Sequence, residues 1–155
     1  EPRKRQKDFQ GVEGLCFAGN CIDNRFDQAS ERYLGEWSKE KLYSSLTKYA
    51  NLVLLSDGEA HPLVCMEALV AGLGLVVSEC SQANLDTSLP FIDVIPESRI
   101  SDLRYVQEII EKNRNVSVGM RNEIRQYGLT FSWKKIVAER YVPAILAVLD
   151  KGEQN

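Results

Sequence analysis

The stretch SDGEAHPLVCME, residues 56–67, decides the predicted fold. The apolar run NLVLL at 51–55 precedes it and has the length of a buried strand, whereas PLVCMEALVAG at 62–72 has the length and composition of a buried helix. The polar loop between them carries two carboxylates and His61, the single histidine of the chain. A strand that feeds a helix through such a loop is the half-unit of a βαβ fold.

The same alternation of short apolar strands and helices extends along most of the chain. It predicts an α/β protein with a doubly wound, parallel, Rossmann-like sheet. In such sheets ligands bind beyond the carboxyl ends of the strands, where the loop 56–61 would lie. The predicted strands are 14–19, 32–34, 51–55, 75–78 and 91–95, and the predicted helices are 39–49, 62–72, 101–112, 117–127 and 133–149.

The start of the helix at 62–72 predicts an anion site. Pro62 has no N–H to lose at the first helical position, so the helix is predicted to begin there. The N–H groups of Leu63 and Val64 would then be free, and together with the helix dipole they favour a phosphate.

Glu67 is an oddly placed carboxylate in this helix. It lies five residues past Pro62, about 7.5 Å along the axis, and its neighbours are apolar. Phosphates at the helix start and ribose hydroxyls at Glu67 would together form a nucleotide site. The alternatives are that Glu67 pairs with a nearby lysine or arginine, or that this face of the helix is solvated.

Length and composition indicate one globular domain, with 155 residues, 44% of them hydrophobic and 26% charged. A net charge of -3 and a pI of about 5.3 do not favour nucleic acid as a partner. No apolar run has the length of a transmembrane segment, and the first residues do not have a signal-peptide pattern. Because there is no initiator methionine, we expect the chain to be a fragment of a longer protein.

The cysteines favour reduced thiols in a cytoplasmic protein. Cys16, Cys21, Cys65 and Cys80 lie in or beside apolar segments and lack CxxC spacing. With a single histidine beside them, a zinc site is not predicted, and no other metal ligands stand out. We expect the four thiols to be small core residues.

Several blocks of the sequence resemble one known family. EAHPLVCME places seven residues between Glu59 and Glu67, and with the following ALVAGLGLVVSE it resembles the E-x7-E region of retaining glycosyltransferases of the GT-B fold, family 4. EPRKRQ at 1–6 is similar to the phosphate-binding loop of that family. YLGEWSKEKLYSSLTKYANLVLLS at 33–56 resembles the stretch before the motif, and FSWKKIVAERY at 131–141 resembles the closing helix.

The resemblance implies a role for each matching residue. Glu67 would bind the ribose hydroxyls of a sugar nucleotide, and Leu63 and Val64 would offer backbone N–H groups to the diphosphate or the sugar. Glu59 would face the transferred sugar. Lys4 falls where the family has a lysine that binds the diphosphate.

Other matches are looser. Arg5 stands where glycine is common in the family and would add a second phosphate contact. His61 would contact the sugar or a phosphate, and a plain loop histidine is the alternative. The turn at Gly35 to Trp37 would border the base, although Trp37 fits a core or edge aromatic equally well.

The resemblance implies that residues 1–155 are the donor-binding domain of a hexosyltransferase. The full enzyme would transfer a sugar from a UDP- or GDP-linked donor to an unknown acceptor with retention, without a cofactor or metal. The first strand and the N-terminal acceptor domain would lie outside this chain, so we expect donor binding without transfer by this chain alone and a gap in the sheet between 14–19 and 51–55. The alternatives are a non-catalytic nucleotide-binding module and a GT-B sugar-nucleotide epimerase.

Overall fold

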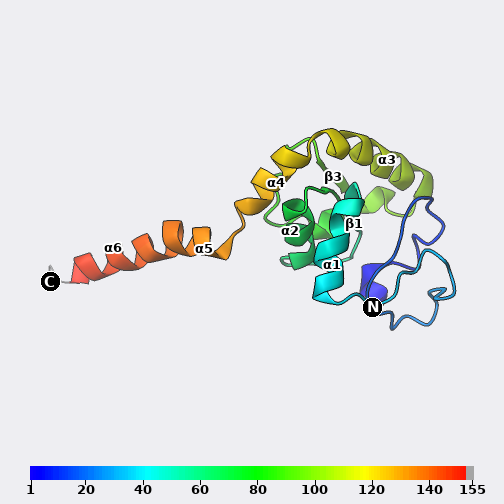
Figure 1. Cartoon of the computed structure of the whole chain (residues 1–155), viewed down its shortest axis with the longest axis horizontal. Coiled ribbons are helices and arrows are strands. Elements are labelled where there is room, and N and C mark those ends of the chain that lie inside the picture. Colours follow the sequence, from blue (N-terminus) through cyan, green and yellow to red (C-terminus); the bar gives the residue numbers. More distant parts are fainter. Residues whose placement is uncertain (153–155) are drawn as a thin grey trace.

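The computed structural model describes residues 1–152 and has an open, parallel, three-stranded sheet at its centre (Figure 1). The strand order is β1 (Asn51–Leu54), β2 (Gly74–Ser78) and β3 (Ile92–Ile95). Leu52 lies opposite Leu75, and Val76 lies opposite Asp93. The predicted α/β class and the parallel sheet are therefore confirmed.

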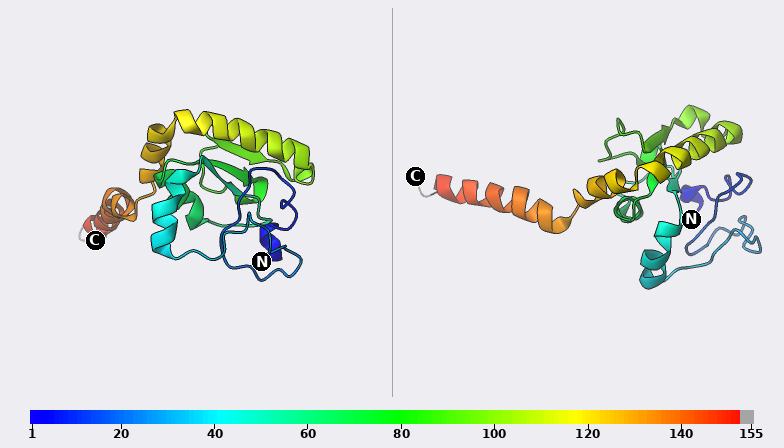
Figure 2. Two further views of the ribbon diagram at one scale, coloured as in Figure 1. Left: turned by 45° about the vertical axis from the view of Figure 1, so that its right-hand side comes forward. Right: turned by 45° about the horizontal axis from the view of Figure 1, so that its top comes forward.

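Helices cover both faces of this sheet: α2 (Leu63–Val70) follows β1 and α3 (Leu103–Gly119) follows β3, whereas only the short turn η3 (Glu79–Ser81) follows β2. Leu75 and Val77 of β2 pack toward α2, whereas Val76 between them packs toward α3 in a second cluster of buried residues. This two-sided burial makes the fold doubly wound (Figure 2). The helices are α1 (Lys39–Ser45), α2 (Leu63–Val70), α3 (Leu103–Gly119), α4 (Arg121–Leu129), α5 (Trp133–Ile136) and α6 (Val142–Gly152), with short 3-10 turns η1 (Pro2–Lys4), η2 (Leu46–Lys48), η3 (Glu79–Ser81) and η4 (Glu97–Arg99) and a π-helical turn η5 (Val137–Tyr141).

Helix α2 begins one residue later than predicted. Pro62 is extended, with φ -73° and ψ 106°, and serves as the N-cap, so Leu63 is the first helical residue. At the other end Gly72 has φ +83°, and the N–H groups of Gly72 and Leu73 bond back to the carbonyls of Leu69 and Ala68. These two bonds form a Schellman turn that ends the helix and leads the chain into β2.

The prediction of strands at 14–19 and 32–34 is wrong. These segments meet in a single parallel bridge between Phe17 and Tyr33 and do not join the sheet. Gly14 and Gly19 have φ angles of 74° and 124°, which interrupt an extended run. Because 14–19 is not a strand, the sheet has no gap there, and β1 is an edge strand of the described sheet.

The boundary between the two helices predicted at 101–112 and 117–127 lies further along the chain than predicted. The first runs on to Gly119 as α3, because Ser117 is buried and donates to Asn113 one turn earlier instead of capping a new helix. The second, α4, begins only after Met120.

The predicted core role of the cysteines holds for Cys65 alone, which is fully buried. Cys16 and Cys80 are exposed and Cys21 is intermediate. Burial raises the pKa of the Cys65 thiol to about 12, so this thiol is an inert packing group.

Candidate functional site

The chain's first residues are fixed against the loop that follows β1. The backbone carbonyl of Arg3 accepts hydrogen bonds from the Asp57 N–H at 3.0 Å and the Ser56 hydroxyl at 3.3 Å. Ser56 is fully buried, and its own carbonyl accepts from the hydroxyls of Ser78, at the end of β2, and Ser81, in the turn that follows. These buried serines hold the N-terminal turn η1 at the carboxyl ends of the strands, where the sequence places the ligand site.

Lys4 and Glu59 meet at this point. Lys4 Nζ lies 3.2 Å from Glu59 Oε1, Arg3 lies 3.7 Å from the same oxygen, and the Arg3 guanidinium also donates to the Gly58 carbonyl. The Glu59 side chain is 13% exposed. Its Oε1 is nevertheless without a hydrogen-bond partner among the described residues, because the lysine lies at ion-pair distance outside hydrogen-bonding geometry. The oxygen is buried, and the two cations beside it hold the Glu59 carboxylate in place.

The start of α2, four residues after Glu59, supplies unpaired donors. Within residues 1–152 the N–H groups of Leu63 and Val64 donate to no protein acceptor, whereas the Cys65 N–H bonds to the Pro62 carbonyl. The two donors and the positive end of the helix dipole favour an anion there.

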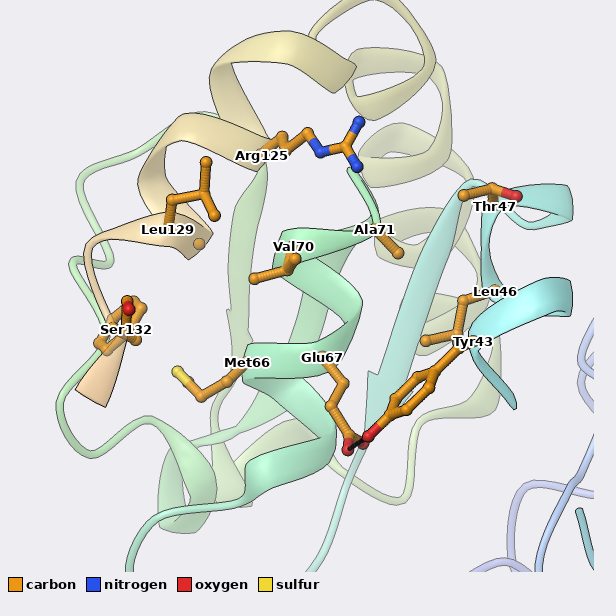
Figure 3. Close-up of a pocket in the computed structure, with 12 residues that line it drawn as sticks. Tyr43, Leu46, Thr47, Met66, Glu67, Val70, Ala71, Arg125, Leu129 and Ser132 are labelled. Carbon is orange, nitrogen blue, oxygen red and sulfur yellow. Dashed lines mark hydrogen bonds between the residues drawn. The ribbon is translucent and has the colours of Figure 1, made fainter. Parts of the chain in front are cut away.

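Glu67 lies four residues past Leu63, about 6 Å further along the axis of α2. Its carboxylate forms no ion pair among the described residues, so the predicted alternative of a lysine or arginine partner is not observed. Instead, Tyr43 of α1 donates its hydroxyl to Glu67 Oε1 at 3.4 Å (Figure 3). Both side chains face solvent in part, so Glu67 retains acceptor capacity for further donors.

The remaining predicted ligands have other partners. His61 is exposed, and its Nδ1 lies 3.5 Å from the Asn84 side-chain amide. Arg5 forms a two-pronged ion pair with Glu97, at 2.9 and 3.1 Å, so its charge is already matched. Trp37 donates Nε1–H to the Leu34 carbonyl and packs against Tyr49, as an edge aromatic does. Gly35 has φ +72° and accepts from the Gly19 N–H.

Sequence reasoning missed Tyr43 and Arg3. Tyr43 is an exposed aromatic on α1, and only the position of α1 beside α2 shows its link to Glu67. Arg3 was visible as part of a basic run, but its contacts with Gly58 and Glu59 depend on the turn η1.

The ion pair between Arg5 and Glu97 predicts a dependence of stability on pH. Hydrogen bonds from Arg5 lower the pKa of Glu97 below its ordinary value. A carboxyl group with a depressed folded-state pKa stabilises the fold above its unfolded-state pKa, and this contribution is lost as the pH falls through the folded-state pKa. We expect Arg5→Gln to lower the free energy of unfolding at pH 7 by about 1 kcal/mol, because the pair is partly exposed.

Urea unfolding of both proteins between pH 7 and pH 3 would measure this difference. The difference between the wild-type chain and Arg5→Gln should shrink toward pH 3. A difference that stays constant across this range would contradict the assigned role of the pair.

No protein-family model, curated protein or solved structure matches this chain in the comparisons made. None of the helices among residues 1–152 is long and apolar enough to cross a membrane. The same residues contain no cluster of three histidine, cysteine, aspartate or glutamate side chains arranged as metal ligands would be.

Proposed function

We propose that this chain is the donor-binding domain of a retaining glycosyltransferase, of the hexosyltransferase type, that uses a UDP- or GDP-linked sugar. One observation carries the proposal. Glu59, ion-paired with Lys4, precedes Leu63 and its free N–H group at the start of α2 by four residues. Both charges act on the Cys65 thiol in the first turn of this helix, and Glu67 follows Leu63 by four residues. This order of cation, helix start and carboxylate matches the order of diphosphate and ribose in a sugar nucleotide.

In this proposal each group binds one part of the donor. The diphosphate would accept from the N–H groups of Leu63 and Val64, with Lys4 balancing its charge. Glu67 would accept from the ribose hydroxyls, and the Glu59 carboxylate, which Lys4 and Arg3 orient, would accept from a hydroxyl of the sugar. As the bond from the sugar to the diphosphate breaks, the leaving diphosphate gains negative charge, which Lys4 and the helix dipole would stabilise.

The decisive variant is Glu67→Gln, which keeps the size of the side chain and removes its charge. A hydrogen bond to a charged acceptor contributes roughly 1.5 to 3 kcal/mol, so we expect the affinity for UDP or GDP to fall at least about tenfold. Isothermal titration of the wild-type chain and the variant with UDP, GDP and ADP would measure this loss.

Glu123→Gln is the matched control, because Glu123 is exposed on α4 and makes no side-chain bond among the described residues. It should bind as the wild-type chain does. Equal affinity of Glu67→Gln and the wild-type chain, or no binding of any of the three diphosphates by the wild-type chain, would refute the proposed site.

A further inference from the structure

A groove adjoins the proposed nucleotide site on α2. Its volume of about 400 Å³ is within the range of about 300–1,000 Å³ that is usual for small-molecule sites. Glu67 is one of its lining residues, so the groove begins where the ribose is proposed to bind. Most of the wall is apolar: Leu46, Met66, Val70, Ala71, Leu129 and Phe131. A flat, largely apolar ring fits such a wall better than a charged group does.

The groove continues in the direction in which a nucleotide would extend. Along α2 the free N–H group of Leu63 comes first, Glu67 follows four residues later, and Ala71 follows after four more, so that each step is about 6 Å. In a nucleoside diphosphate the order is diphosphate, ribose and base. With the diphosphate at Leu63 and the ribose at Glu67, the base would lie over Val70 and Ala71, which line the groove.

The far end of the groove carries an arginine. In Figure 3 Glu67 and Tyr43 lie at one end, Arg125 and Thr47 lie at the other, and Ala71 lies between them. Arg125 of α4 is exposed, and no ion pair among the described residues matches its charge. A guanidinium has N–H donors and no acceptor. This end of the groove therefore favours a base that presents acceptors on its edge.

Among the common bases guanine meets this requirement best. Its O6 and N7 are neighbouring acceptors, and the forked contact of an arginine with these two atoms is the commonest specific contact to a base. Adenine has an N6–H2 donor beside N7, so one of its two groups would oppose the guanidinium. Uracil presents the O4 acceptor without a second acceptor next to it on that edge.

The turn at Gly35 to Trp37, which the family resemblance places beside the base, has no free side-chain donor. The Trp37 Nε1–H donates to the Leu34 carbonyl. Lys41 Nζ lies 5.2 Å from the centre of the Trp37 ring, and the Tyr49 ring lies 6.2 Å from it. The donor and the ring of Trp37 thus have partners within the chain, whereas the Arg125 guanidinium has no ion-pair partner among the described residues.

We propose that this groove is the base subsite of the nucleotide site and that Arg125 makes it selective for guanine, so that the donor is a GDP-linked sugar. The inference rests on the proposed function, because Glu67 holds the ribose from which the base extends. The Arg125 guanidinium donates to O6 and N7 of guanine, and the ring lies against Val70 and Ala71.

Isothermal titration with GDP, ADP and 7-deaza-GDP, in which a C–H group replaces N7, would test the subsite. The wild-type chain should bind GDP at least about tenfold more tightly than ADP, because a forked contact discriminates between bases by about this factor. It should bind 7-deaza-GDP about fivefold less tightly than GDP, because one hydrogen bond is lost.

Arg125→Lys keeps the positive charge and removes the forked geometry. Arg125 is exposed, so the variant should keep its fold, which circular dichroism would verify. It should lose most of the preference for GDP over ADP, and it should bind GDP and 7-deaza-GDP with nearly equal affinity. Arg114→Lys is the matched control, at an exposed arginine of α3 outside the groove, and it should keep both differences.

Two results would overturn the base subsite and leave the nucleotide site standing. In the first, the wild-type chain binds the three diphosphates equally well, and Glu67→Gln weakens all of them. In the second, the preference for GDP persists in Arg125→Lys, which would mean that other groups select the base. If the wild-type chain binds none of the diphosphates, the proposed function fails, and the base subsite fails with it.

Discussion

Replacing Gly128 by alanine should lower the free energy of unfolding by about 3 kcal/mol, the upper part of the range for overpacked cores. A β-carbon on Gly128 would lie 2.6 Å from the Val70 nitrogen and 2.7 Å from the Leu69 carbonyl carbon. Both are backbone atoms of α2, so no side chain can rotate away, and α4 as a whole must shift. Thermal and urea unfolding of Gly128→Ala would measure the loss.

Gly119→Ala is the matched control for this variant. Gly119 also lies in a helix, α3, and nothing lies within 4 Å of the β-carbon that alanine would add. Alanine there should stabilise the chain by about 0.5–1 kcal/mol, because it restricts the unfolded backbone. If both variants changed stability by the same amount and sign, the close contact of α4 with α2 would not be the reason for Gly128.

The sheet was predictable because a short stretch of sequence identifies each of its strands. NLVLL, LVVS and FIDVI are short apolar runs bounded by turn residues, and buried parallel strands have this appearance. GLCFAG at 14–19 has the same appearance, but the glycines at both ends adopt left-handed backbone angles, and Cys16 faces solvent. Apolar content alone therefore does not distinguish a buried strand from a loop.

The candidate site was predictable only in part for a related reason. Leu63, Val64 and Glu67 lie on one helix, so their spacing follows from the sequence. The contact between Lys4 and Glu59 joins residues 55 positions apart, and it depends on the buried hydrogen bonds of Ser56. The contact of Tyr43 with Glu67 and the groove beside it depend on how α1 and α4 pack on α2, which a pattern along one segment does not contain.

Asn113 is the polar centre that joins α3 to the sheet. It is fully buried, and its side-chain N–H2 group donates to the carbonyls of Leu75 and Phe91 and to Asp93 Oδ2, each at 3.0 Å. Its Oδ1 accepts from the side chains of Asn51 and Ser117, at 3.2 and 3.3 Å. All of its hydrogen-bonding groups are satisfied, which is the condition under which a buried polar group stabilises a fold.

Asn113→Asp should therefore lower the free energy of unfolding by at least about 3–5 kcal/mol, more than the other substitutions described above, because it buries an unmatched charge. The substitution keeps the shape of the side chain but replaces a donor by an acceptor that faces two carbonyls and the Asp93 carboxylate. Asn115→Asp, on an exposed position of the same helix, should change stability by less than about 0.5 kcal/mol. Urea unfolding at pH 7 would compare the two variants. Folded domains have only about 5–15 kcal/mol of stability, so Asn113→Asp should be largely unfolded under mild denaturing conditions. If the two variants lowered the free energy of unfolding by nearly equal amounts, Asn113 would not be the link between α3 and the sheet.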